Sequence, residues 1–255
     1  IRRMRNPTWC KSLFVLIKKN QINNNLITII GNDVHHIKNV MRMNINDRVY
    51  AFDNEKNVYL CKIIDISDSV TLEIINVVKY DSELPINVTI AQGLINRDKT
   101  EEVIRRLVEL GCYKYQPVIM DKSIIKYDEK NIKEKAKNDR IDRLNRIVKE
   151  ASEQSERISL MKVENPITLN NLINTFESYD LILFCHVASK DDFTLKELIR
   201  QKKYNNILVI IGPESGFSER EVRLLENAKT KKVSLGKRVL RTETAPLSIM
   251  SIIAY

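Results

Sequence analysis

The chain has 255 residues, of which 43% are hydrophobic and 29% charged, and its formal net charge is +9. The apolar fraction suffices for a folded core and excludes wholesale disorder, and the length fits one large domain or two ordinary ones. No apolar run approaches the roughly 20 residues that span a bilayer, and no apolar segment of a secretory signal follows the basic N-terminus.

The first 80 residues predict a small β-barrel with one short helix. Asn32 or Asp33 can cap this helix, which would run to Met41. β-Branched runs bounded by turn-forming residues predict strands at residues 13–17, 26–30, 48–53, 58–66 and 70–78.

The pattern changes near Pro85, where strands begin to alternate with helices. Asp98 can cap a helix, with Glu101 three residues later completing a capping box. Nearly continuous apolar runs at residues 181–186 and 207–211 are typical of strands buried on both faces. The alternation predicts a parallel, layered α/β domain. We therefore expect two domains, at residues 1–80 and 85–255.

Positive charge gathers in two segments without acidic residues, which precede Asp33 and span residues 227–242. Such segments attract nucleic acids through their phosphates, although a lysine-rich composition alone also makes a protein basic. The basic residues are Arg2, Arg3, Arg5, Lys11, Lys18 and Lys19, then Lys229, Lys231, Lys232, Lys237, Arg238 and Arg241.

The cysteines and histidines form no metal-ligand or disulfide pattern, because no C-x-x-C pair and no zinc spacing occurs. In a chain of this length we expect reduced thiols, a cytoplasmic location and no bound metal. The residues concerned are Cys10, Cys61, Cys112 and Cys185, and His35, His36 and His186.

Three polar loops follow predicted buried strands, the positions where open α/β sheets bind ligands. In the first, IGPESGFS, Gly212 and Gly216 allow close approach to a ligand, and Ser218 with Glu221 forms a capping box. The glycine patterns of a P-loop and of a dinucleotide site are absent. A purely structural loop remains an alternative.

The second loop, LGKRVLRTETAP, crowds Arg241, Thr242 and Glu243 beside a Val-Leu pair, and Thr244 can cap a last helix. An ion-pair cluster is the simpler explanation. The third loop begins with Cys185 and His186, and a lone histidine at a strand end is more often structural than catalytic. No G-x-S-x-G sequence supports a Ser-His-Asp triad.

The segments IGPESGFSEREV and LGKRVLRTETAPLSIMSIIAY resemble the 16S rRNA uridine-N3 methyltransferase family, RsmE, of the SPOUT superfamily. HHIKNVMRM and DRVYAFD look like its PUA-like RNA-binding domain, and RDKTEEVIRRLVELGCYKYQPV and KEASEQSER like other family segments. The resemblance covers nearly the whole chain. It implies a PUA-like β-barrel followed by a methyltransferase domain with a C-terminal trefoil knot, in a homodimer.

The resemblance also implies a cofactor, S-adenosylmethionine (SAM), and a substrate, small-subunit ribosomal RNA or the 30S-type subunit. The location would be cytoplasmic, or an organelle with its own ribosomes. Apolar walls and glycine backbone suit an adenine ring. The implied SAM residues are Cys185, His186, Ile211, Gly212, Glu214, Gly216, Leu235, Gly236, Val239, Leu240, Thr242 and Ala245.

Methyl transfer to N3 of a uridine requires loss of the N3 proton, for which a base or a stabilising cation is useful. We expect Glu243 as the base and Arg241 as the cation, although the two can instead pair and only shape the loop. Lys38 and Arg42, four residues apart, would share a helical face toward RNA. The expected RNA contacts are Arg2, Arg3, Arg5, Lys38, Arg42 and Arg97.

Three positions depart from the family pattern. Ser215 replaces a usual glycine and would be strained if that position needs a positive φ. Asn46 and Asn54 replace glycines in turns, where asparagine tolerates left-handed geometry. Because of Ser215, a second function remains possible, that of a non-catalytic RNA-binding or ribosome-assembly factor with this fold. A SPOUT methyltransferase of another nucleotide is the further alternative.

Overall fold

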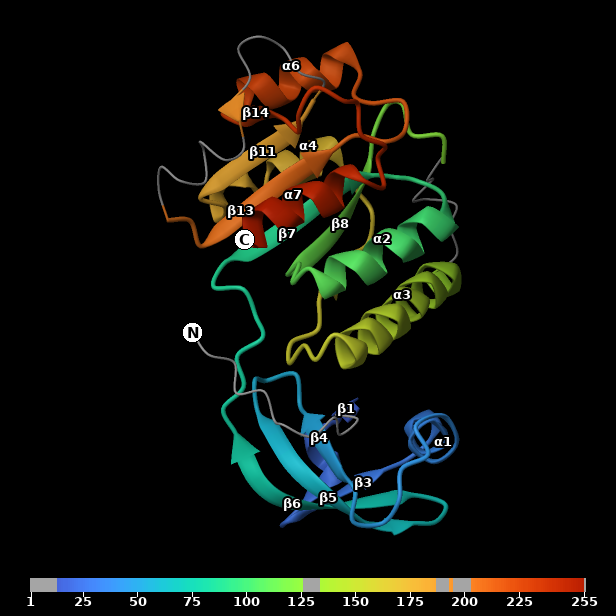
Figure 1. Ribbon diagram of the computed structural model, residues 1–255. Coiled ribbons are helices and arrows are strands. Elements are labelled where there is room, and N and C mark those ends of the chain that lie inside the picture. Colours follow the sequence, from blue (N-terminus) through green and yellow to red (C-terminus); the bar gives the residue numbers. More distant parts are fainter. Residues whose placement is uncertain (1–12, 126–133, 187–192, 195–202, 255) are drawn as a thin grey trace. The chain divides into compact units, whose positions relative to one another are not determined.

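The computed structural model describes residues 13–125, 134–186, 193–194 and 203–254, which divide into two compact units (Figure 1). The first unit holds the described residues up to Ser82 together with the later piece Glu156–Ser159. Within this unit, the Tyr80 hydroxyl donates a 2.6 Å hydrogen bond to Glu156 Oε2, which ties the two pieces together. The second unit holds the remaining described residues.

The first unit is a mixed six-stranded sheet with one apolar core. β1 pairs in parallel with β4, and the other pairs are antiparallel. The strands predicted at residues 58–66 and 70–78 have those bounds, and those predicted at 13–17, 26–30 and 48–53 each end one residue earlier, whereas β2 was not predicted. In sheet order they are β1 (Leu13–Leu16), β4 (Arg48–Phe52), β5 (Val58–Ile66), β6 (Val70–Val78), β3 (Leu26–Ile29) and β2 (Ile22–Asn23).

The short helix of this unit differs from prediction in its cap and in its pitch. Helix α1 (Asn32–His35) is capped by Gly31 at φ 72°, so neither Asn32 nor Asp33 is the cap. It widens into the π-helical segment η2 (His36–Val40), in which Met41 N donates to His36 O. Arg42 lies beyond the helix at φ 51°. The prediction that Lys38 and Arg42 share a helical face is therefore wrong.

Two turns of this unit confirm the expectation for asparagine. Asn46 and Asn54 have φ angles of 77° and 61°, in the left-handed region where asparagine replaces glycine at little cost. The 3₁₀ helix η1 (Lys19–Gln21) completes the unit.

The second unit is a parallel α/β domain, as the sequence predicts. Helices α2 (Arg97–Glu109), α3 (Glu134–Gln154) and α7 (Ala245–Ala254) share one core with one face of the sheet, and α4 (Leu169–Ile173) and α6 (Glu219–Asn227) share the other (Figure 1). In sheet order the strands are β10 (Ile167–Thr168), β8 (Lys114–Ile119), β7 (Asn87–Gly93), β13 (Asn206–Ile211), β11 (Leu181–Cys185), β14 (Lys231–Ser234) and β12 (Phe193–Thr194).

Two smaller elements complete the second unit, β9 (Lys162–Val163) beside β8 and the 3₁₀ helix η3 (Phe176–Ser178). Every strand pair in the sheet is parallel. The carboxyl ends of β7, β13, β11 and β14 therefore meet at one edge, from which the three polar loops emerge. None of the helices in the described part of the chain combines the length and the apolarity needed to cross a bilayer.

The helix caps confirm one prediction and correct another. Ser218 and Glu221 form the predicted capping box of α6. Helix α2 is capped by Asn96, whose side chain accepts a 2.9 Å hydrogen bond from Lys99 N, and not by Asp98. Asp98 lies in the first turn instead, where its negative charge interacts favourably with the positive end of the helix dipole.

Candidate functional site

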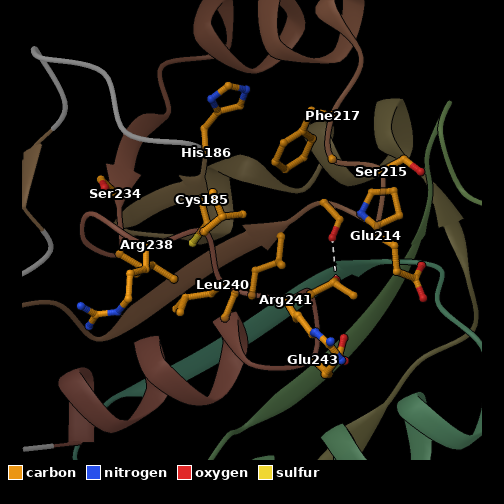
Figure 2. A pocket seen from close by; sticks show the side chains of 18 of the residues that line it. Cys185, His186, Glu214, Ser215, Phe217, Ser234, Arg238, Leu240, Arg241 and Glu243 are labelled. Carbon is orange, nitrogen blue, oxygen red and sulfur yellow. Dashed lines mark hydrogen bonds and ion pairs between the residues drawn. The ribbon is translucent and has the colours of Figure 1, made fainter.

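A cavity of about 790 Å³ lies where the three polar loops meet (Figure 2). Its volume is in the range of small-molecule sites. Every residue predicted for SAM or for catalysis lines it. Lys99, Pro213, Ser215, Phe217, Ser234, Lys237 and Arg238 also line it, and the sequence did not single them out for the site.

One wall of the cavity is apolar. Leu235 and Leu240 are partly buried against the main core of the second unit, and Ile211 and Ala245 are buried in it. Val239 is 80% exposed, although it lies beside this apolar wall. An exposed valine at a cavity mouth gains burial when a flat apolar group enters.

The third loop contributes an aromatic contact and a neutral thiol. The rings of His186 and Phe217 stack at 6.3 Å with 20° between their planes, and Phe184 meets Phe217 edge-on at 6.0 Å. Cys185 is partly buried in the cavity wall, and burial raises the pKa of its thiol to about 12. A raised pKa favours the neutral thiol over the nucleophilic thiolate, so Cys185 contributes a neutral side chain to the wall.

A buried chain of hydrogen bonds holds two of the loops together. The Tyr115 hydroxyl donates to Gln92 Oε1 at 3.0 Å, and Gln92 Nε2 donates to the Thr242 carbonyl at 2.7 Å and to its hydroxyl at 3.1 Å. The Thr242 hydroxyl donates to Gly212 O at 2.8 Å. Thr242 thus lines the cavity, but its hydroxyl is already hydrogen-bonded to the Gly212 loop. Gln92 was not predicted from the sequence, because its partner Thr242 lies 150 positions away along the chain.

Charged side chains gather on another side of the cavity. Lys99 Nζ lies 3.2 Å from Glu214 Oε1 and 3.7 Å from Glu243 Oε2. Arg241 Nη1 lies 3.9 Å from Glu243 Oε1, so the predicted Arg241–Glu243 pair is present but long. Among the described residues, Glu243 Oε2 is buried and has no hydrogen-bond partner. An oxygen of this kind is suited to receiving a ligand proton or donor.

Arg97 does not join this cluster. Its Nε lies 3.0 Å from Glu101 Oε1, one turn along α2, and the side chain is 63% exposed. Lys99, two residues later, reaches the cavity instead. Arg97 and Lys99 share the first turn of α2, and nothing in the local sequence distinguishes them.

Glycine backbone shapes the first loop at two points. A Cβ on Gly93 would lie 2.6 Å from Pro213 Cδ, so only glycine lets this loop pack on the end of β7. Gly216 has a φ of 69° and nothing within 4 Å of its Cβ position. Ser215 is not among the residues with positive φ. The strain that we considered for Ser215 is therefore absent, and with it the observation that favoured a non-catalytic protein.

The structure describes three of the predicted RNA residues, Lys38 and Arg42 in the first unit and Arg97 in the second. Arg2, Arg3 and Arg5 lie outside the described residues. Lys38 Nζ donates to Ser67 O at 2.7 Å, and Arg42 is exposed. In the part of the chain that the structure describes, no group of three or more His, Cys, Asp or Glu side chains is arranged to hold a metal ion.

Comparisons of the sequence and of the structure with known proteins all point to the same family. A model described as an RNA methyltransferase domain matches residues 82–254, and one described as an RNA methyltransferase PUA domain matches residues 29–75. Ribosomal RNA small subunit methyltransferase E of Bacillus subtilis is 33% identical over 248 residues, which are 95% of each chain. The protein of the same name from Aquifex aeolicus is 31% identical over 234 residues, 90% of this chain and 94% of that one.

A solved structure agrees with these matches. The crystal structure of ribosomal RNA small subunit methyltransferase E from Neisseria gonorrhoeae, bound to S-adenosyl methionine, has a TM-score of 0.83. It is 27% identical, and the match covers 94% of this chain and 95% of that chain.

Proposed function

The chain belongs to the family of ribosomal RNA small subunit methyltransferase E, and we propose that it methylates small-subunit ribosomal RNA with SAM as the methyl donor. The acceptor atom in this proposal is N3 of a uridine in 16S rRNA. The observation that carries it is the cavity at the strand ends, which unites an apolar wall, open glycine backbone and a carboxylate whose buried oxygen has no hydrogen-bond partner among the described residues.

The cavity fits the adenosine part of SAM. Val239 and Leu240 offer apolar surface for the adenine ring, and backbone at Gly212 and Gly216 borders the same space. A Cβ on Gly212 would meet the Gly216 backbone at 3.2 Å, so this narrow turn accepts no larger residue without shifting. The volume exceeds what one planar ring fills and leaves room for the methionine part.

SAM supplies an electrophilic methyl group on a sulfonium. Uridine N3 is protonated at neutral pH, so this chain must take its proton before or during methyl transfer. Glu243 offers Oε2 as the proton acceptor. Arg241 is 84% exposed, which leaves its guanidinium able to reach an incoming base and stabilise its negative charge.

RNA binding and assembly complete the proposal. Lys237 and Arg238 at the cavity mouth, and Lys38 in the first unit, supply cations for phosphates. Arg2, Arg3, Arg5, Arg42 and Arg97 are further proposed RNA contacts. The strand order, in which β11 lies between β13 and β14, supports the trefoil knot of the SPOUT superfamily. We propose a homodimer in which α7 forms part of the interface, since Ile252 on this helix is 43% exposed.

Methyl transfer from labelled SAM to small ribosomal subunits that lack this modification tests the proposal. The RNA is digested and its nucleosides are identified by mass spectrometry. We expect 3-methyluridine. A different methylated nucleoside would refute the N3 assignment, and binding to the subunit without methylation or SAM binding would point to an assembly factor.

The variant Glu243→Gln tests the proposed proton acceptor. It keeps the size of the side chain and removes most of its basicity. We expect methyl transfer to fall by about tenfold or more while SAM binding is retained. Unchanged turnover would remove Glu243 from the mechanism.

A further inference from the structure

We propose that Lys99 is a positioning residue of the methyl-transfer site, which acts by holding the Glu243 carboxylate in place beside the cavity. The proposal rests on the proposed function, because it assigns Lys99 a role through the proposed proton acceptor. Lys99 was not among the residues that the sequence suggested for catalysis or for binding.

The geometry places Lys99 between the carboxylates of two loops. Its ammonium group lies 3.2 Å from Glu214 Oε1, in the loop after β13, and 3.7 Å from Glu243 Oε2, in the loop after β14. All three side chains line the cavity. One cation on α2 thus contacts two loops that arrive from different strands, Glu214 near the start of the first and Glu243 near the end of the second.

Lys99 is better placed than Arg241 to control the position of Glu243. The Lys99 side chain is 33% exposed, whereas that of Arg241 is 84% exposed and its contact is longer, at 3.9 Å. Water and salt screen an exposed pair far more than a half-buried one. Lys99 also approaches Oε2, the buried oxygen that no hydrogen bond occupies among the described residues.

The position of Lys99 in α2 departs from the usual preference of helices. It lies in the first turn, where the helix dipole disfavours a cation. Its own backbone N–H is fixed by the Asn96 cap at 2.9 Å, so the side chain starts from a rigid point. The two carboxylates offset the unfavourable dipole. Departures of this kind concentrate at functional sites.

The consequence for the reaction is geometric. Without a cation between them, the carboxylates of Glu214 and Glu243 repel each other, and Glu243 turns toward water. With Lys99 in place, Glu243 Oε2 stays at the cavity and takes the N3 proton. The N3 electron pair then forms the bond to the methyl carbon, and the carbon–sulfur bond breaks with its electron pair going to sulfur. Lys99 keeps its own proton throughout.

Single-turnover methyl transfer at saturating RNA and SAM tests the role of Lys99, with SAM binding measured by calorimetry. We expect Lys99→Met to slow the transfer about tenfold or more, with SAM affinity and the RNA KM within about threefold of wild type. Lys99→Arg restores the cation and should recover a large part of the rate. The matched control is Arg106→Met, which removes an exposed cation paired with Glu109 on the same helix.

A double-mutant cycle that combines Lys99→Met with Glu243→Gln shows whether Lys99 acts through Glu243 or independently of it. We expect the double variant to be no slower than Glu243→Gln alone, because Lys99 has nothing left to position. Additive losses, or equal losses in Lys99→Met and Arg106→Met, would overturn the proposal. So would a KM effect alone. A wild-type protein that transfers no methyl group would overturn the proposed function as well, whereas an active wild type with full activity in Lys99→Met would overturn this proposal only.

Discussion

The substitution Thr242→Val removes the hydroxyl that joins two loops of the cavity. Valine keeps the shape of threonine but loses both the hydrogen bond to Gly212 O at 2.8 Å and the one accepted from Gln92 at 3.1 Å. The bond from Gln92 Nε2 to the Thr242 carbonyl, at 2.7 Å, uses the backbone and is kept. Gly212 O is therefore the group that loses its donor.

The expected cost follows from the burial of these groups. Thr242 is 7% exposed, so water replaces the lost hydroxyl poorly. A buried acceptor left without a partner costs about 1–3 kcal/mol. At about 2 kcal/mol, the midpoint of thermal unfolding of a unit of this size falls by about 4–8 °C. The Gly212 loop is also released, and we expect SAM to bind about threefold to tenfold more weakly.

Chemical unfolding and calorimetry with SAM measure the two effects separately. The control is Thr230→Val, since the Thr230 hydroxyl donates to Leu225 O at 2.8 Å near the end of α6, away from the cavity. It should lower the free energy of unfolding without changing SAM affinity. A Thr242→Val protein with wild-type stability, or one that loses stability but binds SAM as tightly as wild type, would refute the coupling between this hydrogen bond and SAM affinity.

Three further substitutions have definite expected results. Gly93→Ala places a methyl group 2.6 Å from Pro213, so we expect weaker SAM binding by calorimetry and a loss of about 1–3 kcal/mol in unfolding free energy. Hydrogen bonds from Arg220 and Ser218 lower the pKa of Asp121 below its usual 3.8. A lowered pKa stabilises the fold above the unfolded value, so the stability advantage of wild type over Asp121→Asn should shrink in urea unfolding as the pH falls below about 4. Because Ser215 has no positive φ, Ser215→Gly should change SAM affinity by less than about twofold, and a tenfold gain would contradict the geometry described here.

Local patterns predicted the central strands of the second unit, because continuous apolar runs mark strands buried on both faces. The apolar run at residues 207–211 is a central strand with every residue from Ile207 to Ile211 buried. Gly111 follows the last turn of α2 at φ 82°, as expected for a residue that ends a helix. When such strands are parallel, the polar loops that follow them meet at the same edge of the sheet, so the place of the site follows from the strands alone.

Helix starts were predicted less well because several residues compete within one turn. Asn96 and Asp98 are both good caps, and the tertiary path from β7 selects Asn96. In the first unit, Gly31 turns the chain at φ 72° before Asn32 can act as a cap. The π-helical segment after α1 then changes which side chains share a face, and nothing in the spacing of Lys38 and Arg42 indicates it.

The site residues that the sequence missed have partners far along the chain. Gln92 bonds Thr242 across 150 positions, and Lys99 approaches Glu214 across 115. Gln92 and Lys99 flank the end of β7 and the start of α2, which carry no glycine-rich loop and no distinctive motif. Their roles exist only because β7 lies beside β13 in the sheet. In a parallel sheet, the residues that hold a ligand loop therefore belong to the neighbouring strand and the helix after it, and strand order must be known before they can be found.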